Sequence, residues 1–249
     1  MYQSFNTIRR LPLIGGGDEL GVLSDLYIDE RDFLTAWFVI DTGGWFSSNK
    51  VLVRSSHIKG IDADGAAIST DLTRADIENA PSAKSEKTVD DVESTGWSPG
   101  ADHAIYSMAG TSPMLPTSFL LYEENPDGVR VHTDSRSVPV AETHLRSASD
   151  ILGYGLDAAD GDFGSVADLV FSDDVWRLAY VAIDTGNWLP GRVVVLSPEW
   201  TKPFVWEHRK IAVDLTRDQI RQAPPLADLA GLERSYETDL QRYYGVPMM

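Results

Sequence analysis

Residues 36–45 read AWFVIDTGGW, and residues 179–188 read AYVAIDTGNW. The two stretches lie 143 positions apart, and this offset aligns residues 21–81 with residues 164–224 without a gap, giving 19 identities in 61 positions. Such a long and regular match indicates one structural unit used twice. We therefore predict two tandem repeats, over residues 1–81 and 144–225, and expect them to pack through equivalent faces about a pseudo-twofold axis.

Each repeat has the pattern of short strands separated by turns. The expected strands are rich in aliphatic, aromatic and β-branched residues. They cover Val22–Ile28, Thr35–Ile40 and Lys50–Arg54 in the first repeat, and Ser165–Phe171, Leu178–Ile183 and Arg192–Leu196 in the second. Closely spaced hairpins favour a small barrel over alternating strands and helices. The predicted fold class is therefore mainly β, with two tandem small β-barrels.

A short helix is expected at the end of each repeat. Thr216 and Gln219 have the spacing of a capping box, and Thr73 with Asp76 is a weaker form of the same signal. A proline follows each expected helix and should end it.

A further, amphipathic helix is expected in the tail, residues 226–249. Leu232, Tyr236, Leu240 and Tyr244 recur every four residues and would form one apolar stripe on it. Tyr236, Leu240 and Tyr244 are the candidate interaction residues, and we expect the stripe to pack on a barrel or on a partner.

Residues 82–143 match neither repeat. Residues 82–110 are rich in Ser, Gly, Asp and Glu, which predicts a linker. The sequence Asn125-Pro126-Asp127-Gly128 lies between two strand-like runs, so a hairpin is expected near residues 118–134.

The composition argues against several classes of function. Lys and Arg number 21 against 38 Asp and Glu, and the resulting net charge of −17 opposes nucleic-acid binding. The absence of cysteine excludes disulfides, thiolate catalysis and iron–sulfur clusters, and the five histidines lack metal-ligand spacing. No apolar run approaches the ~18 residues of a membrane-spanning helix. We therefore expect a soluble, cytoplasmic protein with no cofactor, no metal, no transmembrane segment and no nucleic-acid partner.

A family resemblance rests on the motif of the second repeat. Residues 184–198 read DTGNWLPGRVVVLSP, which resembles the PRC-barrel domain, named after the cytoplasmic part of the photosynthetic reaction centre H subunit. Residues 168–169, residues 213–217 and the tail at residues 236–247 also resemble bacterial tandem PRC-barrel proteins, so the resemblance covers the two repeats and leaves out residues 82–143. The first repeat has Ser47-Ser48-Asn49 where the family has Pro-Gly-Arg. The structural signature comprises Asp41, Thr42, Gly43 and Trp45 in the first repeat, and Asp184, Thr185, Gly186, Trp188, Pro190, Gly191 and Arg192 in the second.

The resemblance implies a small barrel of six-stranded type and a role in binding or assembly without catalytic residues. It further implies an unknown protein partner, or a second copy of the chain in a homo-oligomer. The H subunit also has an N-terminal membrane helix, for which this sequence offers no counterpart.

Two other functions remain open at the level of sequence. The duplicated Asp-Thr-Gly triplets, with Asp41 and Asp184, are also typical of pepsin-like aspartic proteases, in which two carboxylates share one proton. The competing interpretation is a turn in which aspartate accepts backbone N–H bonds and glycine takes a positive φ. Gly44 and Asn187 favour the turn, because proteases usually have Ser, Thr or Ala there. The second alternative is a small-molecule site between the two barrels.

Overall fold

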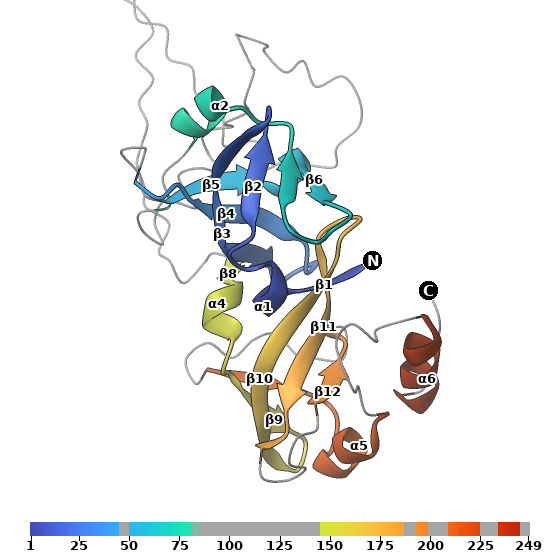
Figure 1. The fold of residues 1–249 in the computed structure, drawn as a ribbon. Coiled ribbons are helices and arrows are strands. Elements are labelled where there is room, and N and C mark those ends of the chain that lie inside the picture. The colour runs from blue at the N-terminus through green and yellow to red at the C-terminus, as the bar shows by residue number, and fades with distance from the viewer. Residues whose placement is uncertain are drawn as a thin grey trace, which may run out of the picture.

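Each repeat forms a curled β-sheet in the computed structural model (Figure 1), which describes residues 1–44, 50–80, 83, 145–186, 193–198, 209–224 and 234–244. The mainly β fold class is therefore confirmed. The predicted hairpin near residues 118–134 lies outside the described residues, as does most of the predicted linker.

The first sheet has the strand order β5-β4-β3-β2-β7-β6. A short 3-10 turn, Ser55–His57, leads from β5 to β6, and helix α2, Arg74–Glu78, follows β7. The strands are β2 (Pro12–Gly15), β3 (Asp18–Asp29), β4 (Thr35–Asp41), β5 (Lys50–Arg54), β6 (Ile58–Ile61) and β7 (Ile68–Thr70).

The second sheet has the strand order β12-β11-β10-β9-β13, and helices α5, Arg217–Gln222, and α6, Arg234–Tyr244, follow it in the chain. Its strands are β9 (Gly155–Ala158), β10 (Gly161–Ser172), β11 (Arg177–Asp184), β12 (Val193–Leu196) and β13 (Lys210–Ala212). The predicted strands therefore lie where the sequence pattern put them, and β5 has the predicted bounds.

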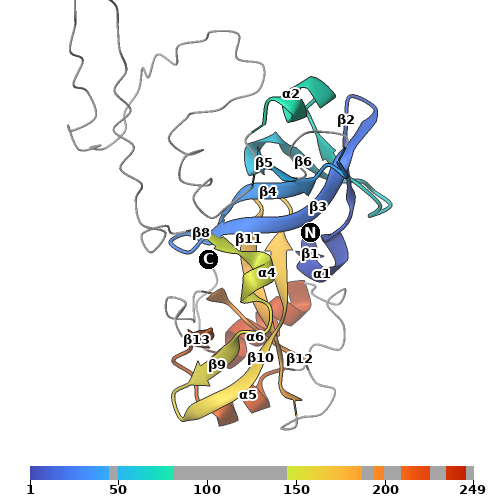
Figure 2. The ribbon, with the colours of Figure 1, turned by 90° about the vertical axis from the view of Figure 1, so that its left-hand side faces the viewer.

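Two strand–helix segments lie at the junction of the sheets (Figure 1 and Figure 2). The first consists of β1 (Tyr2–Ser4) and α1 (Phe5–Ile8), and the second of β8 (Leu145–Ser147) and α4 (Ala148–Ile151). We call these segments the first arm and the second arm.

The longest strand of each sheet passes very close to its neighbour at a glycine. A Cβ on Gly21 of β3 would lie 2.6 Å from the carbonyl oxygen of Asp41, and one on Gly164 of β10 would lie 2.4 Å from that of Asp184. Both glycines also have a positive φ, 146° and 62°. A shift in strand register, typical of a β-bulge, follows shortly after each glycine. Such bulges bend a strand and increase its twist, so the curl of the two sheets begins here.

The predicted helix caps are confirmed in both repeats. The Thr216 and Gln219 side chains form a complete capping box at the start of α5, and Thr73 with Asp76 forms one at the start of α2. The second of these was expected to be weaker, but Asp76 Oδ2 accepts the Thr73 N–H at 2.8 Å. Both helices therefore begin at the predicted residues.

Helix α6 packs on the outer face of the second sheet. Leu240 is buried in one cluster with Val170 and Tyr180, and Tyr236 and Tyr244 are half-buried against it. The Tyr236 hydroxyl donates to the carbonyl oxygen of Pro224 at 2.8 Å. Of the two expectations for the apolar stripe, these three residues pack within the chain, on the second sheet, while Leu232 lies outside the described residues.

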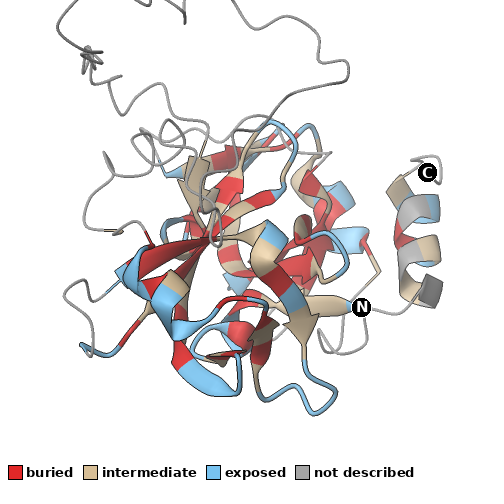
Figure 3. Cartoon of the chain, turned by 90° about the horizontal axis from the view of Figure 1, so that it is seen from above, coloured by how far each residue is buried: buried red, intermediate tan, exposed pale blue. Residues whose placement is uncertain are grey.

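Buried residues lie along the strands of both sheets (Figure 3). A single apolar cluster contains core residues of both repeats, from Leu13 and Ile68 in the first to Ile211 and Ile220 in the second. The two repeats therefore share one core.

Candidate functional site

The two arms are exchanged between the repeats. Strand β1 of the first repeat pairs with β10 of the second, and β8 of the second repeat pairs with β3 of the first. Tyr2 lies opposite Ser172, and Leu145 lies opposite Asp29, so both pairings have the same register under the offset of 143. The expected pseudo-twofold packing is therefore present, and it is made by an exchange of secondary structure.

A buried aspartate fixes the first arm. Ser4 Oγ donates to Asp168 Oδ2 at 2.5 Å, and the Asn6 N–H donates to Asp168 Oδ1 at 3.1 Å. Asp168 is only 5% exposed, and it also accepts the N–H of Leu169 at 2.8 Å. Ser4 also caps α1 by accepting the N–H of Thr7. Hydrogen bonds to a carboxylate are stronger than those to a neutral acceptor, so Asp168 fixes both Ser4, at the end of β1, and Asn6, at the start of α1.

The second arm is fixed in the same way. Ser147 Oγ donates to Asp25 Oδ2 at 2.6 Å, and the Ser149 N–H donates to Asp25 Oδ1 at 3.0 Å. Asp25 and Asp168 are equivalent positions of the two repeats, as are Ser4 and Ser147. The sequence comparison identifies all four residues, but neither the pairing across repeats nor the role of the aspartates was predicted.

The tips of two hairpins also exchange hydrogen bonds across the junction. The Thr35 N–H donates to the carbonyl oxygen of Trp176 at 2.9 Å, and the Leu178 N–H donates to that of Phe33 at 2.8 Å. Phe33 and Trp176 are equivalent residues, and both have a positive φ, 62° and 53°. A positive φ is strained for bulky aromatic residues. The shared hydrogen bonds and the aromatic packing offset this strain.

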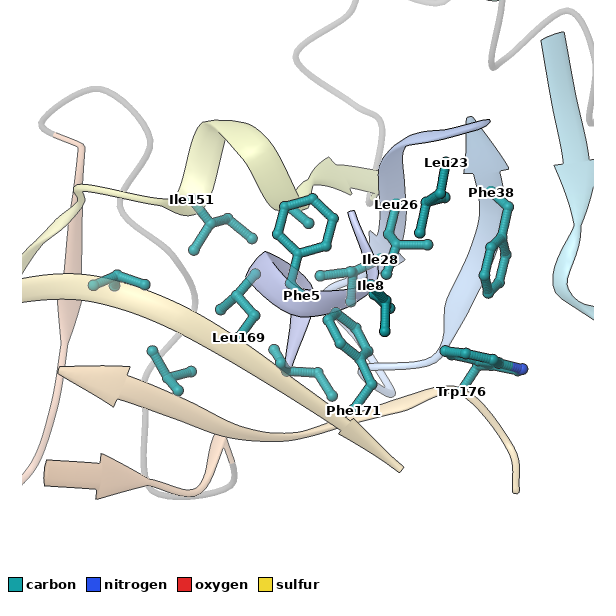
Figure 4. Packing of buried hydrophobic residues seen from close by; sticks show 14 of the residues in the cluster. Phe5, Ile8, Leu23, Leu26, Ile28, Phe38, Ile151, Leu169, Phe171 and Trp176 are labelled. Atoms are coloured by element: carbon teal, nitrogen blue, oxygen red, sulfur yellow. The ribbon is translucent and has the colours of Figure 1, made fainter. Parts of the chain in front are cut away.

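Apolar side chains fill the junction between the two sheets (Figure 4). The first arm contributes Phe5 and Ile8, and the second sheet contributes Leu169 and Phe171. The ring of Trp176 meets Phe38 of the first sheet edge-on, with centroids 4.9 Å apart. The small-molecule alternative placed a ligand between the barrels, but the described part of this region is occupied by packed side chains.

Polar contacts at the edge of the junction differ between the two halves. Arg146 Nε and Nη2 donate to the two carboxylate oxygens of Glu30 at 2.9 and 3.1 Å. The equivalent positions hold Gln3 and Asp173, joined by one hydrogen bond of 3.2 Å. The backbone geometry is therefore repeated, while the charges that accompany it are not.

The Asp-Thr-Gly triplets form two separate turns. Asp41 Oδ1 accepts the N–H of Gly43 at 2.9 Å, and Asp184 Oδ1 accepts the N–H of Gly186 at 2.8 Å. Both glycines have a positive φ, 65° and 56°. The intervening threonines, Thr42 and Thr185, are buried. In both triplets the aspartate therefore accepts a backbone N–H and the glycine takes a positive φ, as expected for a structural turn.

The two triplets do not meet. Asp41 ends β4 and Asp184 ends β11, and these strands start side by side at an antiparallel bridge between Leu34 and Arg177. They run away from that bridge in opposite directions, so each aspartate stands roughly 20 Å along its strand from the junction. A proton shared by the two carboxylates, which an aspartic protease needs, is incompatible with this arrangement. Of the other signature residues, Trp45, Trp188, Pro190, Gly191 and Arg192 lie outside the described residues.

Asp160 and Lys210 of the second repeat make exposed polar contacts. The N–H of Arg217 lowers the pKa of Asp160, and a hydrogen bond from Lys210 to Asp162 raises the pKa of that lysine. In the described ranges no three His, Asp or Glu side chains come together as a metal site. In the same ranges no helix is long and apolar enough to cross a membrane.

Comparison with known families gives one match, over the first repeat. Residues 3–77 match the PRC-barrel domain. The match begins within β1, so it includes the arm that packs on the second sheet. No curated protein matches the chain. The curled first sheet, its Asp-Thr-Gly turn and this match together show that residues 3–77 contain a PRC-barrel domain.

Proposed function

We propose that this chain is a non-catalytic assembly module, in which two PRC-type barrels act as one rigid body and bind a protein partner. The observation that carries the proposal is the reciprocal exchange of the arms. Because each sheet is completed by a strand from the other repeat, the barrels keep a fixed relative orientation. A preorganised surface loses less entropy on binding than two independently moving ones.

The residues with the strongest chemical signals support an architectural role. Asp25 and Asp168 bond the arms, and Asp41 and Asp184 bond the turns that follow their strands. Each of these carboxylates accepts backbone N–H groups. We therefore assign them to structure, and we propose that the second repeat is a PRC-type barrel too, since its strands and turns follow those of the first.

The chemistry of the partner follows from the charge of the chain. A net charge of −17 favours encounter with a basic surface and repels nucleic acid. A cytoplasmic location and kinship with the H subunit's cytoplasmic domain belong to the same proposal; the first is supported by the lack of cysteine and the second by the motif at residues 184–198.

Affinity purification tests this proposal. The tagged full-length chain is expressed in its own host at native level, crosslinked and recovered, and the co-purifying protein is then produced separately. We expect a stoichiometric complex in calorimetry whose affinity falls as salt is raised from about 0.05 to 0.5 M, because screening weakens charge attraction. An Asp168→Ala variant should bind more weakly than an Asp173→Ala variant, since the first removes the more buried contacts and loosens the junction more. A host that yields no stoichiometric protein partner would contradict the proposal.

A further inference from the structure

Two exposed apolar residues lie on the hairpin tips that cross at the junction. Within the described ranges, the large apolar side chains that stand exposed are Met1, Leu34, Val175 and Tyr243. Leu34 is 39% exposed and Val175 is 56% exposed. Leu34 directly precedes Thr35 and Val175 directly precedes Trp176, the two residues joined by the hydrogen bond of 2.9 Å across the junction. One exposed apolar residue of each repeat therefore lies at the same crossing point.

The fold itself does not require an apolar residue at either position. The position equivalent to Leu34 is Arg177, and the position equivalent to Val175 is Asp32. Each of these charged residues stands in the corresponding hairpin of the other repeat, and the backbone hydrogen bond across the junction is made on both sides. The second copy of the hairpin thus serves as an internal control. It shows that the architecture accepts charged residues here, so packing within the chain does not account for Leu34 and Val175.

A carboxylate stands beside each of the two apolar residues. Asp32 Oδ1 accepts the Leu34 N–H, and Asp174 Oδ1 accepts the Val175 N–H, both at 2.9 Å. Both aspartates are exposed, and neither forms an ion pair within the described part of the chain. The other acidic side chains of the tips are each paired with a cation: Asp29 with Arg31, Glu30 with Arg146, and Asp173 with the Met1 ammonium. The charge left at the two apolar residues is therefore negative.

We propose that Leu34 and Val175, together with Asp32 and Asp174, form a docking surface for a protein segment in which lysine or arginine flanks an apolar side chain. We call these four residues the tip surface. The inference rests on the proposed function and deepens it, because it names the surface that receives the basic partner. Apolar contacts supply burial and the flanking charges select the partner. The reciprocal hydrogen bonds hold the two halves of the surface in one arrangement before binding, which lowers the entropy lost on binding.

A short synthetic peptide is the first probe of the tip surface. The end-blocked peptide Lys-Lys-Leu-Leu-Lys-Lys is titrated into the isotope-labelled full-length chain, and backbone chemical shifts are followed by NMR. We expect the largest changes at residues 31–35 and 174–177. A peptide with glutamine in place of lysine, or with serine in place of leucine, should bind at least about fivefold more weakly, because each lacks one of the two kinds of contact. Equal binding of the serine peptide, or shift changes spread over the acidic surface at large, would overturn the proposal.

Variants of the chain locate the contact. Leu34→Ser and Val175→Ser shorten the apolar side chains, and Asp32→Asn and Asp174→Asn remove the charges. Each should weaken binding of the lysine–leucine peptide by roughly threefold to fivefold.

Two matched controls change the same chemistry away from the tips. Asp64→Asn neutralises an exposed carboxylate in the turn between β6 and β7, and Tyr243→Ser removes the exposed apolar side chain of α6. Both should leave peptide binding unchanged. Tip variants that bind like the wild type, or controls that weaken binding as much as the tip variants do, would reject the assignment.

The partner recovered from the host separates this inference from the proposed function. A partner that binds the chain carrying both Leu34→Ser and Val175→Ser as tightly as the wild type would refute the tip surface and leave the assembly role standing. A host that yields no stoichiometric partner would contradict the assembly role, and the peptide titration would then decide the tip surface by itself.

Discussion

Replacing Asp168 with alanine should destabilise the whole chain. The carboxylate accepts two hydrogen bonds from the first arm, and each such bond to a charged group contributes about 1.5 kcal/mol net, so the free energy of unfolding should fall by about 3 kcal/mol. In a chain of this size that corresponds to a melting temperature lower by roughly 6–12 °C. Because the repeats share one core, urea unfolding followed by circular dichroism should stay a single transition with unchanged slope.

Asp173→Ala is the matched control for this experiment. Asp173 also bonds this end of the chain, through Gln3 and through the exposed N-terminal ammonium of Met1 at 2.6 Å, but both contacts lie at the more exposed edge of the junction, so we expect a loss below about 1 kcal/mol. A double-mutant cycle between Ser4→Ala and Asp168→Ala should give a coupling energy of about 1.5 kcal/mol. If Asp168→Ala were no more destabilising than Asp173→Ala, or if the repeats unfolded in two separate steps, the reasoning about the arms would be refuted.

Three further predictions concern single residues. Gly164→Ala should lower the free energy of unfolding by about 2–3 kcal/mol, because its Cβ would collide with the carbonyl oxygen of Asp184. Gly16 has the same φ of 62° but open space around it, so Gly16→Ala should lower the free energy of unfolding by only about 1 kcal/mol. Thermal melts that rank the two variants equally would contradict this. Trp176→Ala should lower the free energy of unfolding, measured in urea, by about 3–5 kcal/mol, because it leaves a cavity at the junction. A loss below about 1 kcal/mol would show that the ring does not join the sheets. Burial raises the pKa of Tyr244. The neutral hydroxyl therefore stabilises α6 below the ordinary tyrosine pKa of about 10, and this stabilisation is lost as the pH rises beyond it. Tyr244→Phe should retain more helical signal than the wild type at pH above about 11, and an identical alkaline loss in both proteins would argue against this role of Tyr244.

The local structure could be predicted from the sequence because its signals are local. The β-branched and aromatic residues of their sequences placed β4 and β11, and the pairs Thr73–Asp76 and Thr216–Gln219 marked both helix starts. The four-residue spacing of Tyr236, Leu240 and Tyr244 gave the stripe that packs on the second sheet.

The exchange of the arms could not be predicted in this way. Periodicity identifies a strand but not its partner, and Ser4 meets Asp168 across 164 positions of sequence. A signal was nevertheless present, since Asp25 and Asp168 are charged residues repeated within strands that are otherwise largely apolar. A repeated acid in a buried strand needs a fixed set of donors, and here the other repeat supplies them.

Covalent fusion of the two arm-exchanged halves has a consequence for their divergence. In a pair built from two identical chains, every substitution at the junction would appear twice, once on each side of the axis. Here the Arg146–Glu30 ion pair stands on one side and Gln3–Asp173 on the other. In a single polypeptide, a residue at the edge of the junction can change in one repeat without changing in the other. A symmetric backbone framework can therefore present two unlike surfaces.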